Sequence, residues 1–218
     1  MNYSQMKSIF EENADEEKAA GMAHYMRDQF SFYGIQAAAR KALYKDFLKE
    51  EKKERRIDWA FLDQCYSDPH REFQYFVCDY LTRMVNFLDT SDLPHIRKYV
   101  VARSWWDTID SLCKVIGKIS LRDKSIGREM LIWAGDKDLW VRRTAIEYQL
   151  GLKEKTDTGI LEDILVMNFG SDRFFINKAI GWALRDYSKT DPEWVSSFIS
   201  RNMEKMSSLS IREGSKYL

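Results

Sequence analysis

Two tryptophans and two aspartates lie close together in this 218-residue chain, in the stretch Ser104-Trp105-Trp106-Asp107-Thr108-Ile109-Asp110. Residues three or four apart share a helix face, so Trp106 and Asp110 are expected to project together. An electron-rich ring beside a carboxylate can hold a cation. A purely structural explanation also exists, in which Ser104 caps a helix, the tryptophans fill the core and the aspartates are solvated. The local pattern leaves both interpretations open.

The stretch belongs to a helical pattern that repeats along the chain. Four segments open on an aromatic residue and are spaced by 32, 35 and 34 residues; they begin at Phe73, Trp105, Trp140 and Phe174. Helical patterns fill the gaps, as at residues 126–134 and 159–169. This period suits a pair of helices with two turns, and such pairs stack into solenoids. We therefore predict an all-α, HEAT-like solenoid of antiparallel helix pairs with a concave binding face, as one domain over residues 1–218.

One repeat departs from the others at its sixth position. The residue there is Cys78, Ala145 or Ala179 in three repeats, but Asp110 in the fourth. Burying an unpaired carboxylate costs several kcal/mol, so Asp110 is expected to face a wet concave surface rather than the core. A local shift of register in that repeat is the alternative.

Other unusual residues fall at the same place in their own repeats. Arg143 follows Trp140 by about one helical turn, and Trp182 lies three residues beyond Ala179. If the repeats stack in parallel, Asp110, Arg143 and Trp182 lie along one side. A groove that follows a phosphate backbone combines cations with aromatic rings. The basic residues interleaved with tryptophans here are Arg142, Arg143, Lys178 and Arg185. Amphipathic helices with solvated basic faces are the alternative interpretation.

Composition narrows the class of protein. Basic and acidic residues number 34 each, so no global positive field indicates a polyanionic partner. Hydrophobic residues make up 44% of the chain, which is enough for a buried core. The cysteines are odd in number and lack CxxC spacing, which predicts reduced thiols in the cytoplasm. No apolar run approaches the length of a membrane span.

The residue patterns of common cofactor sites are missing. There is no Gly-rich phosphate loop and no GxSxG elbow, which argues against a nucleotide cofactor. The histidines, His24, His70 and His95, are too far apart in sequence for a typical zinc motif, so no metal is expected. A carboxylate chemistry without cofactors remains.

The N-terminal third predicts two helices, at residues 15–30 and 37–48, with a break at Phe32-Tyr33-Gly34-Ile35. The charges at residues 49–56 mix both signs, which is typical of a solvated helix end.

These residues resemble the AlkD-type HEAT-like-repeat DNA glycosylases, which excise alkylated purines. The matching segments are 22–26, 32–35, Arg71-Glu72-Phe73-Gln74, 104–110, 143–146 with Gln149-Leu150, and 174–187. The resemblance implies that Asp110 is the catalytic carboxylate and that Trp106 and Trp182 contact the sugar and backbone of the lesion. It also implies that Arg143 binds a phosphate and that Tyr25 belongs to the surface facing the lesion. The expected partner is double-stranded DNA that contains alkylated purines, and the expected enzyme is a cytoplasmic monomer.

The chain departs from the family pattern near its N-terminus. Ala38 and Lys41 stand where the family usually has a proline and an arginine. Lys41 is therefore counted among the predicted DNA-binding residues, with Arg142, Lys178 and Arg185. A catalytically weak or inactive paralogue, acting as a DNA- or protein-binding scaffold, is the alternative to a glycosylase.

Overall fold

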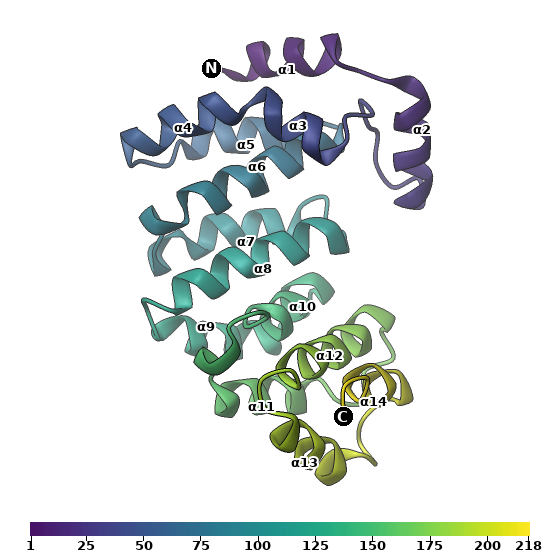
Figure 1. Ribbon diagram of the computed structural model, residues 1–218. Coiled ribbons are helices and arrows are strands. Elements are labelled where there is room, and N and C mark those ends of the chain that lie inside the picture. Colours follow the sequence, from purple (N-terminus) through teal and green to yellow (C-terminus); the bar gives the residue numbers. More distant parts are fainter. The chain divides into compact units, whose positions relative to one another are not determined.

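The computed structural model describes residues 1–218, and all of its regular elements are helices (Figure 1). One isolated bridge, between Ser31 and His70, is the single strand-like contact. The predicted all-α class is therefore confirmed. The chain forms two compact units, residues 1–87 and residues 88–218. The expectation of a single domain stays a prediction.

The first unit contains six α-helices and a short 3-10 helix. Their bounds are α1 Tyr3–Glu12, α2 Glu16–Tyr25, α3 Ala37–Leu43, α4 Lys45–Glu54, α5 Trp59–Ser67, α6 Arg71–Met84 and η1 Val85–Phe87. The break predicted at residues 32–35 is confirmed, but the helix before it ends at Tyr25 rather than at residue 30. The helix predicted after it is divided at Tyr44 into α3 and α4. The charged segment ends α4, where Arg55 adopts a left-handed conformation.

The loop at residues 32–35 is held by a buried acid. The backbone N–H groups of Tyr33, Gly34 and Ile35 all donate to the carboxylate of Glu72, at 2.9–3.1 Å. Gly34 has a φ of 87°, and a Cβ there would lie 2.0 Å from the carbonyl oxygen of Asp15. The loop therefore needs both a glycine at position 34 and the acid at the start of α6. The segments at residues 32–35 and 71–74, which were separate motifs in the sequence, are therefore joined by these hydrogen bonds.

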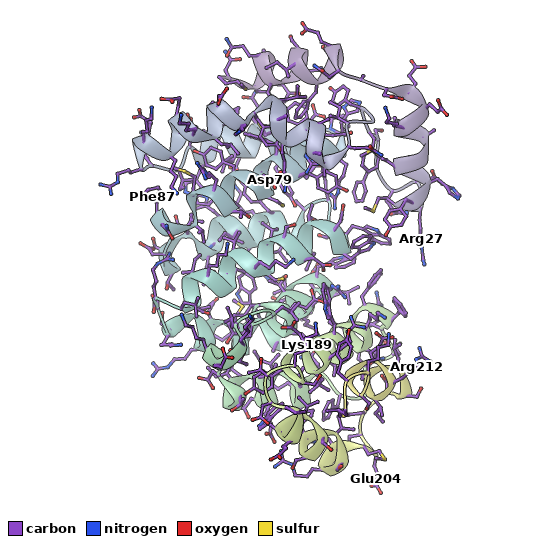
Figure 2. The ribbon with its side chains drawn as sticks, in the orientation of Figure 1. Arg27, Asp79, Phe87, Lys189, Glu204 and Arg212 are labelled. Carbon is purple, nitrogen blue, oxygen red and sulfur yellow. The ribbon has the colours of Figure 1, made fainter.

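Helix α2 is unusual because none of its residues is buried. Its last residue, Tyr25, is 70% exposed. The chain leaves the helix through Arg27 and Asp28, which both have a φ of 56°. Arg27 lies at the end of this helix in Figure 2. Left-handed non-glycine residues cost free energy, and this exposed helix buries little surface that could offset the cost.

The second unit holds the remaining helices. Their bounds are η2 Thr90–Asp92, α7 Leu93–Val101, α8 Trp106–Ser120, α9 Ser125–Ala134, α10 Leu139–Glu147, η3 Lys153–Lys155, α11 Thr158–Met167, α12 Phe174–Tyr187, α13 Pro192–Asn202 and α14 Ser208–Gly214. Helices α8, α10 and α12 pack side by side, and α9 packs against both α10 and α11 (Figure 1). The four aromatic segments found in the sequence lie at the beginnings of α6, α8, α10 and α12. The helical repeat is therefore confirmed.

The repeated helices form because each carries an apolar stripe. Ile109, Leu112, Ile116 and Ile119 of α8 are all buried at helical spacing. Helix α10 begins at a side-chain cap, where the Asp138 carboxylate accepts from two backbone N–H groups, at 2.7 and 3.1 Å. The three cysteines are buried and form no disulfide, as small core residues are expected to be.

Candidate active site

The stretch at residues 104–110 forms the entrance to α8. Ser104 does not cap this helix: its hydroxyl donates to the carbonyl of Val100, at 2.6 Å, and so closes α7. The N-cap position belongs to Trp105, whose backbone is extended and which provides no side-chain cap. Trp106 is therefore the first helical residue, and Asp110 lies one turn further along. This register directs Trp106 and Asp110 to the same side of α8.

An open pocket of about 310 Å³ lies over α8, α10 and α12. Its lining residues are Trp106, Asp110, Arg143, Phe174, Phe175, Lys178, Trp182 and Arg185. The structure thus brings together six of the nine predicted site residues. Phe174 and Phe175 were found in the sequence only as members of a repeat, and the structure adds them to the site.

Arg143 joins two acids at the base of the pocket. Its Nη2 donates to Oδ1 of Asp110, at 3.0 Å, and lies 2.8 Å from Oε1 of Glu147. Its Nη1 donates to the carbonyl of Phe175, at 2.9 Å. Neither oxygen of Glu147 has an aligned hydrogen bond, so its 2.8 Å contact with Arg143 is a close approach of the two groups. One guanidinium is therefore shared by two carboxyl groups.

The two carboxyl groups differ in their access to water. The side chain of Glu147 is fully buried, whereas that of Asp110 keeps 18% exposure towards the pocket. Burial raises the pKa of Asp110, and Arg143 opposes this shift. Burial raises the pKa of Glu147 well above its usual value, and the nearby Asp110 raises it further. Asp110 therefore ionises first, and Glu147 retains its proton to higher pH.

Glu147 was not recognised in the sequence analysis. It lies one turn after Arg143 on α10, so the i,i+4 spacing of an arginine and an acid was a visible signal. That signal usually marks a solvated pair on a helix surface. Only the packing of α8 against α10 shows that the pair is buried and that Asp110 joins it.

Aromatic side chains support the pocket from below and reach its rim. Trp105, Trp140 and Phe175 contact one another, with ring centroids 4.9–5.7 Å apart. This cluster fixes Phe175, whose carbonyl holds Arg143. Phe174 packs edge-on against Phe175 but is 59% exposed. The exposed ring and the half-buried Trp106 and Trp182 offer flat apolar faces to a ligand.

The predicted basic residues have different surroundings. Lys178 and Arg185 line the pocket, and both bind the carboxylate of Glu213 on α14, at 2.9 and 2.6 Å. Arg142 does not line the pocket, because its Nε donates to Asn168, at 2.8 Å. Tyr25 and Lys41 belong to the other unit. Lys41 is exposed there and lies 3.4 Å from Asp79 of α6.

Comparisons with known proteins identify the family of this chain. A family model described as "DNA alkylation repair enzyme" matches residues 6–218. The chain belongs to the DNA alkylation repair enzyme family. None of the curated proteins matches it at the significance required.

Two solved structures are similar to this member of the DNA alkylation repair enzymes. A protein described as a predicted DNA alkylation repair enzyme, from Enterococcus faecalis, is 35% identical, with a TM-score of 0.87 over 94% of this chain and 96% of that one. The protein smu.31 from Streptococcus mutans UA159 is 19% identical, with a TM-score of 0.61 over 82% and 97% of the two chains. The second likeness shows the fold alone.

Family membership makes DNA the expected substrate. No three His, Cys, Asp or Glu side chains lie close enough together to hold a metal ion. No helix has both the length and the apolar character needed to cross a bilayer. The roles predicted for the individual site residues stay predictions.

Proposed function

We propose that the protein is a monofunctional DNA glycosylase that hydrolyses the N-glycosidic bond of cationic alkylpurines, such as 3-methyladenine and 7-methylguanine, in duplex DNA. The observation that carries this proposal is Asp110, a carboxylate that lines an open pocket together with Trp106 and Trp182. A site meant only to bind a polyanion gains nothing from a carboxylate directed into it. A site that stabilises a positively charged sugar does gain from such a carboxylate.

The chemistry follows from the charge of the substrate. Alkylation of a ring nitrogen makes the base a cation, so the bond between C1′ and the base breaks with both electrons moving to the base, which leaves neutral. The sugar then carries the positive charge, and a water molecule adds its oxygen to C1′ and loses a proton to solvent. No acid is needed to activate the leaving group. Stabilisation of the sugar cation is therefore the main task of the enzyme.

The residues of the pocket divide this task. Asp110 provides the negative charge, while Trp106 and Trp182 present electron-rich faces to the developing cation. Arg143 and the carbonyl of Phe175 restrict the orientation of the Asp110 carboxylate. Lys178 and Arg185 are the cations at the pocket that we assign to phosphate, whereas the unpartnered Nε of Arg143 is buried.

The open pocket predicts a substrate range set by charge rather than by size. Its lining contains no set of polar groups arranged to read the edge of an extruded base, unlike the fitted pockets of enzymes that flip nucleotides. Bulky cationic N-alkylpurines should therefore be released along with methylated ones. Uracil should persist, because its glycosidic bond needs leaving-group activation. The expected monomer and cytoplasmic location stay predictions.

A release assay tests the proposal. The protein is incubated with duplexes that carry 7-methylguanine, a bulky cationic N-alkylpurine or uracil, and free base is measured by chromatography. We expect release of both cationic bases above their spontaneous loss. Retained DNA binding without release would support a scaffold. Rapid release of uracil would contradict recognition by charge at an open surface. Release of 7-methylguanine without release of the bulky cationic base would contradict it as well.

A further inference from the structure

Glu213 collects three cations at the edge of the pocket. Its carboxylate lies 2.9 Å from Lys178 Nζ, 2.6 Å from Arg185 Nη1 and 3.0 Å from Lys216 Nζ. Lys178 and Arg185 line the pocket and come from α12, whereas Lys216 follows α14 and does not line it. The Glu213 side chain is itself buried, at 6% exposure. The acid is thus enclosed by the groups that it binds.

The backbone of α12 and α14 keeps this acid in place. A Cβ at Gly181 would lie 2.5 Å from Cβ of Glu213 and 3.0 Å from the carbonyl oxygen of Ser210, so only glycine allows the helices to approach this closely. The hydroxyl of Ser210 donates to the carbonyl of Asn177, at 2.8 Å, and fixes the two helices along their length. The position of the Glu213 carboxylate relative to α12 is therefore set by backbone packing.

The two cations held by Glu213 flank a predicted catalytic residue. Lys178, Trp182 and Arg185 are spaced by four and three residues, so they share one face of α12. The four charged groups of the cluster carry three positive charges and one negative charge, which leaves a surplus of two positive charges. Lysine and arginine are flexible, and they repel each other when no acid lies between them.

We propose that Glu213 is a positioning residue that holds Lys178 and Arg185 on either side of Trp182 as a preformed subsite for a DNA phosphate next to the lesion. This inference rests on the proposed function. The two long cationic side chains lose their conformational entropy when the protein folds, so this loss does not weaken the binding of DNA. Hydrogen bonds from Lys178 and then Lys216 lower the pKa of Glu213 to about 2, so the acid stays ionised at neutral pH.

Two simpler roles make different predictions for Glu213→Gln, which keeps the shape and removes the charge. A purely structural ion pair would lower the stability of the protein and weaken every kind of DNA binding together. A purely electrostatic role would strengthen all DNA binding, because a negative charge near the phosphates is lost. A positioning role would retain or strengthen binding to undamaged DNA but reduce the preference for a damaged site.

The decisive quantity is the discrimination ratio, defined as the Kd for undamaged duplex divided by the Kd for a duplex with a tetrahydrofuran abasic analogue. We expect Glu213→Gln to lower this ratio about tenfold, with a similar fall in the rate of 7-methylguanine release. Lys216→Ala is the matched control, because Lys216 binds Glu213 without lining the pocket, and it should leave the ratio unchanged. An unchanged ratio in Glu213→Gln, or an equal weakening of both Kd values, would overturn the proposal.

A double-mutant cycle shows whether Glu213 acts through its cations. In a Lys178→Ala/Arg185→Ala background, Glu213→Gln should have no further effect on the ratio, and a further tenfold loss there would contradict a positioning role. If Glu213→Gln does not fold, Glu213→Asp keeps the charge and withdraws it by one methylene. We then expect the discrimination ratio to fall about threefold, and an unchanged ratio would contradict the proposal.

The outcome for the proposed function stays separate. If the wild-type protein releases no base, the proposed glycosylase function is contradicted, but the discrimination ratio still tests the role of Glu213. Wild-type protein with a ratio near one would contradict the subsite itself.

Discussion

Two ion clusters contribute to one pocket, and their compositions are opposite. At the ends of α8 and α10, the acids Asp110 and Glu147 share the single cation Arg143. Between α12 and α14, the single acid Glu213 binds three cations. The first cluster has more acid than base, and burial raises the pKa of both carboxyl groups. The second has more base than acid, and its carboxyl pKa falls to about 2.

In the function proposed above, the difference corresponds to the two parts of an alkylated nucleotide. The sugar becomes positive during base loss, and the acid-rich cluster exposes one carboxylate where such a charge can be stabilised. The phosphate is always negative, and the base-rich cluster has a surplus of cations beside Trp182. In each cluster a buried partner fixes the group that faces the pocket. In this proposal, the sign of the surplus charge, rather than the presence of ion pairs, distinguishes the catalytic surface from the binding surface.

The largest effect should come from removing the shared cation. Arg143→Met should lower the free energy of unfolding by about 3–5 kcal/mol, because two buried acids lose their counter-ion. Urea denaturation measures this loss. Arg142→Met, on the same helix, breaks only the hydrogen bond to Asn168 and should cost about 1 kcal/mol.

A second substitution sharpens this test. Adding Glu147→Gln to Arg143→Met removes one of the two acids left without a cation, and it should restore more stability there than Glu147→Gln adds to the wild type. A loss below 1 kcal/mol in Arg143→Met, or a gain from Glu147→Gln that is no larger in this background than in the wild type, would mean that the acid-rich cluster is not held together by its arginine.

Asp110→Asn removes the charge that faces the sugar while it keeps the shape of the side chain. The excision rate should fall about a hundredfold, as when one preorganised electrostatic group is lost. DNA affinity should be retained or slightly increased, because a negative charge leaves the DNA-facing surface. Single-turnover release of 7-methylguanine measures the rate, and Asp107→Asn, on the same helix but outside the pocket lining, is the control. Wild-type excision by Asp110→Asn would rule out Asp110 as the catalytic residue.

The base-rich cluster should control the salt dependence of binding. Arg185→Ala and Lys178→Ala should each weaken binding, to damaged duplex more than to undamaged duplex, and lower the salt slope by about one unit. Titrations at several ionic strengths measure the slope, with the exposed Lys205→Ala as the control. Slopes equal to that of the wild type would show that these cations do not meet phosphate.

The smallest effect concerns the pH dependence of stability. The folded-state pKa of Glu147 is raised, so its contribution favours folding below the unfolded pKa of about 4.3 and is lost as pH rises towards the folded value. Glu147→Gln should therefore stabilise the protein at pH 7, and a gain of about 1 kcal/mol would raise the melting temperature by about 2–4 °C. The gain should vanish below pH 4.

The control for this prediction is Glu204→Gln, at a side chain that projects from the surface after α13 (Figure 2). Its melting temperature should match that of the wild type across the same pH range. A destabilised Glu147→Gln at pH 7 would mean that Glu147 is ionised in the folded protein.

Much of this molecule was visible in the sequence. The spacing of four aromatic segments predicted the helical repeat, and the charge of Asp110 at a position otherwise held by small residues predicted a site on α8. Both inferences work because a helix has a fixed period, so the sequence alone determines which residues share a face. The same rule brought Lys178, Trp182 and Arg185 together on α12.

The partners of these residues were decided only by the tertiary structure. Glu147 and Glu213 resemble surface acids in the sequence, yet both are buried against charges from neighbouring helices. Ser104 has the composition of a helix cap, but the position of α7 gives its hydroxyl a carbonyl to bind instead. Arg142 and Arg143 are adjacent and chemically identical, and the packing of α10 directs one to Asn168 and the other to Asp110. Helical periodicity orders residues along one element, whereas burial and ion pairing depend on how several elements pack.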